Sequence, residues 1–323
     1  MSPPSERALV ERDGRVIPVF QRLPPDADFP ARSALPRIAV VGGSSVHIGD
    51  DTGRAPAEFP QLLGQRLGIE VINLGSPGLD SHDHSRLVDE LLAFDWTAIV
   101  LYAGHNDFGN AFFLRRYAGV SGAMNSAIRG LFGRSALYAW LRGALLQPVG
   151  GGDLHYRPGL PKLSDAEVRA SEDALDRNIR RISWRCRRAG VPLVVVVPAV
   201  DWMVAPLQVD CDGDRCPQTL YREGLAAVGR DAAEAAAKLR EAGDADRQLL
   251  HVTTAAQQGM RTVDTDLVVD AERDLPRQNG ASIPGHRLFM DSVHFNAQGH
   301  RAMARLLADA LTKAGIAGGT GSD

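Results

Sequence analysis

Short apolar runs alternate with helical patterns along this chain, and this alternation limits the possible folds more than any other feature. The runs cover residues 37–41, 69–73, 97–102 and 191–197, with a further candidate within 261–269. Short, β-branched apolar runs are typical of strands buried on both faces. Helical patterns cover 57–68, 83–94, 164–188, 217–242 and 296–313. The alternation predicts an α/β fold in which helices cover both faces of a parallel sheet.

Capping residues mark the ends of two of these helices. Ser164 and Glu167 form a capping-box pattern at the start of the long helical pattern 164–188, and Gly190 follows its end. Asn296 is a good N-cap for the last helix, and Gly315 is its stop signal. These boundaries therefore depend on local chemistry as well as on periodicity.

The length of 323 residues, with 44% hydrophobic residues, allows one large core. We expect one domain over residues 37–316. Residues 1–36 are proline-rich and charged and are interpreted as an N-terminal arm. Residues 108–160 mix aromatic residues with glycine, arginine and serine and suggest a mostly helical insertion. Residues 317–323 are expected to form a flexible tail.

The charge pattern limits the partners that this chain can bind. The formal net charge is −3 and no basic stripe is visible, so nucleic acid is not an expected partner. The N-terminus lacks the pattern of a signal peptide. No apolar run approaches the roughly 20 residues of a membrane span. A cytoplasmic location is therefore expected, and the oligomeric state stays open.

The chain has three cysteines, too few and too scattered for a disulfide framework. Cys211 and Cys216 flank a turn-rich tetrapeptide and are close enough in sequence for a local bridge. Two reduced loop cysteines are the simpler interpretation and are favoured here. Without a nearby histidine or third cysteine, the pair is a poor zinc site.

Polar residues and glycines gather where the predicted strands end. Residues 42–49 (GGSSVHIG), 73–78 (NLGSPG) and 104–107 (GHND) each follow a strand, and 291–294 (DSVH) precede the last helix. Ligands of open α/β sheets bind beyond the carboxyl ends of the strands. A nucleophile, a base, a group that orients the base and oxyanion donors are all present there, as a serine hydrolase requires.

These four segments resemble, in order and approximate spacing, the signature blocks of the SGNH hydrolase (GDSL-like esterase/lipase) superfamily. Gly42-Gly-Ser44 is similar to block I, with Gly43 in place of the usual aspartate. Gly78, Asn106 and the pair Asp291 and His294 match blocks II, III and V. The sequence GHNDF also resembles a bacterial subgroup with Gly-His-Asn-Glu/Asp-Phe in block III.

The resemblance implies a three-layer, flavodoxin-like, doubly wound parallel sheet and an ester hydrolase without a cofactor or metal. Ser44 would be the nucleophile, with His294 as the base and Asp291 as its orienting acid. The oxyanion hole would consist of Ser44, Gly78 and Asn106. His47, His105 and Asp107 are possible residues of the site wall. The substrate would be a small or medium acyl ester that reacts through an acyl-enzyme.

Several alternatives remain at this stage. Ser44 or Ser45 could simply cap a helix. The same triad could transfer an acyl group to a sugar or metabolite hydroxyl, or the chain could be a non-catalytic ligand-binding relative. An α/β-hydrolase is excluded because position 46 is valine where the Gly-x-Ser-x-Gly elbow needs glycine.

Overall fold

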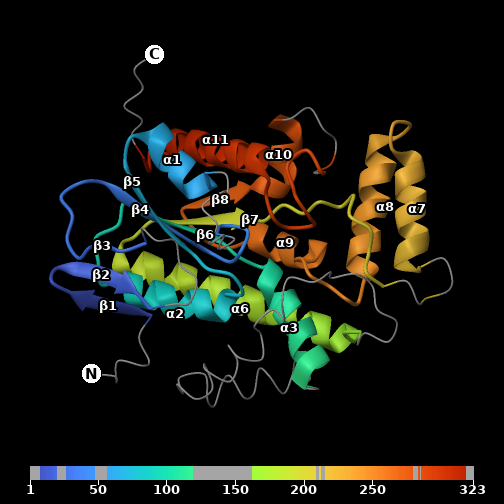
Figure 1. Cartoon of the computed structure of the whole chain (residues 1–323), viewed down its shortest axis with the longest axis horizontal. Coiled ribbons are helices and arrows are strands. Elements are labelled where there is room, and N and C mark those ends of the chain that lie inside the picture. Colours follow the sequence, from blue (N-terminus) through green and yellow to red (C-terminus); the bar gives the residue numbers. More distant parts are fainter. Residues whose placement is uncertain are drawn as a thin grey trace.

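A five-stranded parallel sheet forms the centre of the protein (Figure 1). The structure, a computed structural model, describes residues 8–19, 27–47, 57–118, 162–208, 211, 215–278, 283 and 285–317. The strands are β4 (Arg37–Gly42), β5 (Glu70–Gly75), β6 (Ala98–Tyr102), β7 (Leu193–Val197) and β8 (Leu267–Asp270). Their spatial order is β5-β4-β6-β7-β8, and each neighbouring pair is parallel. This is the flavodoxin-like order, which confirms the predicted doubly wound fold.

Helices cover both faces of the sheet and complete the three layers (Figure 1). One face packs against α1 (Phe59–Leu67), α10 (Ala271–Gln278) and α11 (Ala297–Lys313). The opposite face packs against α2 (Ser81–Leu91), α6 (Asp165–Ala189) and α9 (Thr254–Arg261). Alternate residues of a strand point to opposite faces, so Val40 joins the first core and Val41 the second. Both cores are buried, as the uninterrupted apolar strands predict.

The predicted caps determine where the helices begin and end. Ser164 and Glu167 form the capping box of α6, and Gly190 ends that helix in a left-handed conformation with φ of 69°. Asn296 caps α11 by accepting bonds from the backbone N–H groups of Gln298 and Gly299. α2 begins two residues before its predicted start, because Asp80 caps it instead.

The helical pattern over 217–242 is a hairpin of two helices instead of one helix. α7 (Pro217–Ala227) and α8 (Ala232–Ala245) are separated by a turn in which Gly229 has a φ of +81°. Asp231 then caps α8. The hairpin lies beyond the carboxyl end of β7, at the right of Figure 1. Gly224 of α7 faces Leu239 of α8 so closely that a β-carbon would lie 2.7 Å from the leucine side chain.

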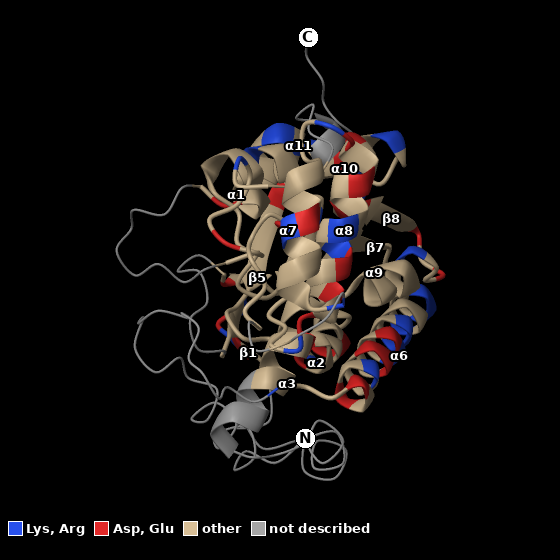
Figure 2. Ribbon diagram, turned by 90° about the vertical axis from the view of Figure 1, so that its right-hand side faces the viewer, with Lys and Arg blue, Asp and Glu red and all other residues tan. Residues whose placement is uncertain are grey.

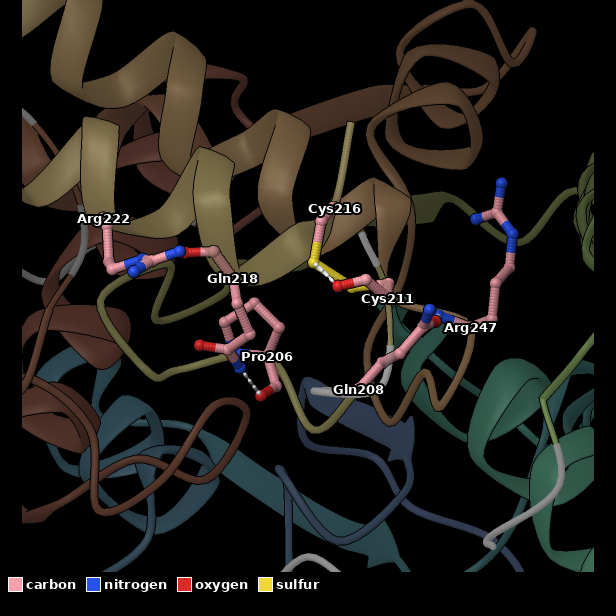
Figure 3. Close-up of a disulfide and its surroundings, with 7 residues drawn as sticks. All are labelled: Pro206, Gln208, Cys211, Cys216, Gln218, Arg222 and Arg247. Carbon is pink, nitrogen blue, oxygen red and sulfur yellow. Dashed lines mark hydrogen bonds between the residues drawn. A yellow bond between two sulfur atoms is a disulfide. The ribbon is translucent and has the colours of Figure 1, made fainter. Parts of the chain in front are cut away.

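Cys211 and Cys216 form a disulfide next to the first turn of α7 (Figure 3). The prediction of two reduced loop cysteines is therefore wrong. Cys216 is the N-cap of α7, and the amide of Gln218 donates a hydrogen bond to the Pro206 carbonyl at 2.7 Å. The bridge and this bond hold the segment that leads from β7 into the hairpin. Cys186 is the free cysteine and is buried.

A small antiparallel sheet lies within the N-terminal region that the sequence suggests is an arm. It consists of β1 (Leu9–Arg12), β2 (Arg15–Pro18) and β3 (Phe29–Pro30). Glu90 of α2 accepts hydrogen bonds from the backbone N–H groups of Ala8 and Leu9, both at 2.8 Å. Phe29 packs edge-on against Trp96. The guanidinium of the buried Arg37 lies 4.5 Å from the centre of the Trp96 ring. These contacts attach the small sheet to the main core.

The expected insertion at about 108–160 begins inside helix α3 (His105–Ala118). Its remainder, residues 119–160, lies outside the described residues, as do residues 318–323 of the expected tail. Within the described ranges, no helix combines the length and apolar composition needed to cross a bilayer. Figure 2 shows that acidic and basic residues alternate along the ribbon of α6. Among them, Asp176 pairs with Arg180.

Candidate active site

The predicted site residues gather at one end of the sheet, around the point where the chain order reverses. Ser44 follows β4, and Asn106 lies in the first turn of α3 directly after β6. β4 and β6 are neighbours, and the connections that leave their carboxyl ends run in opposite directions along the sheet, which is where open α/β sheets bind their ligands. Gly78 follows β5 on the other side of β4, and the loop before α11 brings Asp291 and His294 to the same place.

Ser44 occupies a tight turn directly after β4. The Gly43 carbonyl accepts hydrogen bonds from the N–H groups of Val46 and His47, at 3.0 and 3.2 Å. The buried Val46 side chain packs so tightly on Gly42 that a β-carbon there would come within 2.3 Å of it. No helix begins at Ser44 or Ser45, because residues 44–46 form a turn and the N-cap of α1 is Glu58, so the helix-capping alternative is wrong.

Ser44, His294 and Asp291 form a continuous hydrogen-bond chain. Ser44 Oγ lies 2.8 Å from His294 Nε2, and His294 Nδ1 lies 2.6 Å from Asp291 Oδ2. A neutral imidazole that donates from Nδ1 to the carboxylate leaves Nε2 free to accept the serine proton. Partial burial raises the pKa of Asp291, but hydrogen bonds from the His294 ring and from the N–H groups of Val293 and His294 outweigh it. Together these contacts lower the pKa of Asp291 to about 2.

The loop that carries this pair is held by the cap of α11. The Asn296 side chain accepts bonds from the helix and also donates toward the carbonyls of His286, Arg287 and Phe289. The Met290 N–H donates to the His294 carbonyl at 2.8 Å. The Asn296 side chain therefore connects the loop that carries Asp291 and His294 to the start of α11.

Gly78 and Asn106 are both connected to the short segment that leads into α2. Gly78 belongs to this segment, and Asn106 of α3 contacts it. Gly78 has a φ of +81°, a conformation in which a side chain would be strained. Its carbonyl accepts a hydrogen bond from the Asn110 amide at 3.0 Å. One N–H of the Asn106 amide donates to the Leu79 carbonyl at 2.8 Å. An amide nitrogen carries two protons, so the second can serve a ligand.

The three possible wall residues have different environments. His105 is buried, and burial, followed by the nearby His251 and His294 rings, lowers its pKa to about 3. His47 is nearly buried and pairs with Glu58, with 2.9 Å between Nδ1 and Oε2. The Asp107 carboxylate binds the hydroxyl and the N–H of Ser81. Asp107 therefore joins α3 to the start of α2.

Three polar residues near the site escaped the sequence interpretation. Glu58 binds His47 and also accepts a hydrogen bond from Asn73 at 2.9 Å. Asn110 lies one helical turn after Asn106, a spacing that could have identified it. Asp201 follows β7 and is fully buried against the loop of the base. Asp201 could have been found from the sequence, because it is a polar residue soon after a predicted strand, as Ser44 and Asn106 are.

The arrangement can support nucleophilic attack by a hydroxyl oxygen. A hydroxyl whose proton an oriented imidazole accepts is the activated nucleophile of acyl transfer. Among the described residues, no cluster of three or more histidine, cysteine, aspartate or glutamate side chains has the geometry to hold a metal ion.

Comparison with known families gives a match over most of the chain. The model of the GDSL-like lipase/acylhydrolase family matches residues 40–302, which contain all of the predicted site residues. A comparison with curated proteins finds no match.

Solved structures of low sequence identity resemble this one over most of its length. An acetyl xylan esterase, AlAXEase, is 13% identical with a TM-score of 0.44, covering 85% of this chain and 99% of its own. A GDSL-like lipase from Bacteroides thetaiotaomicron is 11% identical with a TM-score of 0.42, covering 86% of this chain and 88% of its own. A catalytic mutant of Axe2, an acetylxylan esterase from Geobacillus stearothermophilus, is 13% identical with a TM-score of 0.43, covering 88% of this chain and 95% of its own.

Proposed function

Because the chain belongs to the GDSL-like lipase/acylhydrolase family, whose members are serine hydrolases that act on esters, we propose that it hydrolyses a small or medium acyl ester through Ser44. The observation that carries this proposal is the hydrogen-bond chain of the site. It joins Ser44 Oγ to His294 Nε2 at 2.8 Å and His294 Nδ1 to Asp291 at 2.6 Å.

In the proposed first step, Ser44 Oγ attacks the ester carbonyl carbon while its proton moves to His294 Nε2. Asp291 holds the imidazole in the tautomer that can accept this proton and stabilises the resulting imidazolium. Collapse of the tetrahedral intermediate breaks the bond to the alcohol oxygen. His294 then donates its proton to that oxygen, and the acyl group remains on Ser44.

In the proposed second step, water replaces the alcohol. His294 accepts a proton from water as the oxygen attacks the acyl-enzyme, and it returns that proton to Ser44 Oγ when the acid leaves. The same base would serve an acceptor hydroxyl, and this would make the protein an O-acyltransferase. Product analysis with and without added alcohols separates the two outcomes.

The negative charge that develops on the carbonyl oxygen needs hydrogen-bond donors. We assign this role to the backbone N–H groups of Ser44 and Gly78 and to the Asn106 amide. The loss of one such donor typically costs about 3 kcal/mol of transition-state stabilisation. The left-handed φ of Gly78 and the bond from Asn110 to its carbonyl support this assignment, because they keep the segment in one conformation.

Labelling with a fluorophosphonate probe tests the nucleophile. We expect the wild type to be labelled and Ser44→Ala to lose both labelling and ester hydrolysis. Ser45→Ala is the matched control, because Ser45 is the adjacent residue of the same turn and is buried. Labelling that persists in Ser44→Ala would disprove the assignment. A wild type that hydrolyses no member of a broad ester panel would favour a non-catalytic relative.

The cellular compartment is a separate prediction. The sequence favours the cytoplasm, whereas a Cys211–Cys216 bridge is typical of an oxidising environment. Fractionation of the source cells, followed by thiol labelling of the protein in each fraction, distinguishes the two.

A further inference from the structure

We propose that Asp201 is a positioning residue that holds the loop of the catalytic base. This inference rests on the proposed function, because it assigns a role in the same reaction. Asp201 follows the carboxyl end of β7, and its side chain is completely buried.

Asp201 contacts the loop of the base at two separate points. Its backbone N–H donates a hydrogen bond to the Ser292 carbonyl at 2.9 Å, directly between Asp291 and His294 in the sequence. Its Oδ2 lies 2.7 Å from Nδ1 of His286, at the beginning of the same loop. The other carboxylate oxygen accepts the Met203 N–H at 3.0 Å and so stays in place. Asp201, which follows the carboxyl end of β7, therefore contacts both ends of the segment 286–292.

The side-chain contact joins the same two atom types as the proposed catalytic pair. In both pairs Nδ1 of a histidine lies close to an aspartate oxygen, at 2.6 Å for His294 and 2.7 Å for His286. The burial of the two histidines differs, because the His286 side chain is 68% exposed and that of His294 is 24% exposed. The His286 contact therefore joins an exposed ring to a fully buried carboxylate.

The charges of Asp201 and Asp291 also interact. Burial raises the pKa of Asp201, the Met203 N–H and the His286 ring lower it, and the charge of Asp291 raises it further. Asp201 therefore lies within electrostatic reach of the carboxylate that orients the base.

Steady-state kinetics of Asp201→Asn test this role. We expect kcat to fall about tenfold while KM stays within about twofold, because the base loses orientation and the substrate contacts are unchanged. Asp176→Asn is the matched control. It removes a carboxylate from an exposed ion pair on α6, so kcat should not change. Wild-type kcat in Asp201→Asn would overturn the proposal.

Substitutions of His286 keep the test decisive if Asp201→Asn does not fold. His286→Ala removes the contact to the buried carboxylate from an exposed position and should lower kcat about threefold. His286→Asn places an amide N–H near the position of Nδ1 and should restore most of the loss. If alanine and asparagine at this position both give wild-type kcat, His286 does not hold the loop.

Histidine NMR separates this inference from the proposed function. The ring resonances of His294 can be compared between wild type and Asp201→Asn without any substrate. A change of these resonances in Asp201→Asn, with none in Asp176→Asn, supports the positioning role even if no ester is hydrolysed. If esters are hydrolysed and the His294 resonances are the same in wild type and in Asp201→Asn, the inference fails while the proposed function stands.

Discussion

Gly43 and Asn106 approach each other so closely that a β-carbon on residue 43 would lie 2.3 Å from the amide nitrogen of Asn106. No side-chain atom can occupy that space without a shift of Asn106 or of the turn that carries Ser44. The glycine that replaces the usual aspartate of block I therefore has a physical reason. The absence of a side chain at Gly43 lets the Asn106 side chain lie directly against the turn that carries Ser44.

Gly43→Ala should lower kcat by about tenfold or more, because the methyl group displaces the Asn106 amide from the position proposed for the oxyanion. Gly43→Asp restores the usual block I pattern and should be at least as damaging. The control is Gly109→Ala, where a β-carbon finds open space. Steady-state kinetics measure the effect, and a Gly43→Asp variant with higher kcat than wild type would contradict this explanation.

Asn106→Ala should lower kcat about a hundredfold with little change in KM, because the amide contributes mainly when the oxyanion forms. Asn178→Ala is the control. Its amide also donates a hydrogen bond, to Ser81 at 2.8 Å, but it lies on α6. An Asn106→Ala variant that raises KM and leaves kcat unchanged would place the amide in substrate binding instead.

His300 should make the fold sensitive to mild acid. The ring is buried, and its Nδ1 accepts the Phe59 N–H at 3.2 Å. Burial, partly opposed by Glu58 and reinforced by His294, lowers the pKa of His300 from 6.5 to about 4. The unfolded chain therefore binds the extra proton first, and stability should fall as the pH drops from about 6.5 toward 4, by up to roughly 3 kcal/mol.

Urea unfolding at pH 7 and at pH 4.5 measures this contribution. His300→Asn keeps an acceptor near the Phe59 N–H but cannot be protonated in this range. Its free energy of unfolding should therefore fall less between the two pH values than that of the wild type. An equal fall in both proteins would mean that His300 is not responsible.

Thiol labelling checks the disulfide. Under denaturing conditions without reductant, one thiol per chain should react, that of Cys186, and reduction should raise the number to three. Cys211→Ser should expose a second reactive thiol at Cys216. Three reactive thiols before reduction would show that the bridge does not form in the isolated protein.

The sequence alone determined the order of the elements and the identity of the catalytic candidates. β-branched runs such as 191–197 form strands, and the capping residues Ser164 and Asn296 mark helix starts, because these signals act over a few neighbouring residues. Ser44, Gly78 and Asn106 follow predicted strands, and Asp291 and His294 precede the last predicted helix. The resemblance of these segments to the SGNH signature blocks then singled the five residues out. The break between α7 and α8 was missed, because the Ala-rich helical pattern continues on both sides of it.

Only the tertiary structure decided which of these residues meet. Ser44 and His294 are 250 residues apart in the chain, and their 2.8 Å contact depends on how α11 packs on the sheet. The burial of Asp201 and its contact with His286 follow from the same packing, as does the fit of Asn106 against Gly43. Local sequence signals carry no information about such distances, because side chains from different elements meet only after the layers have packed.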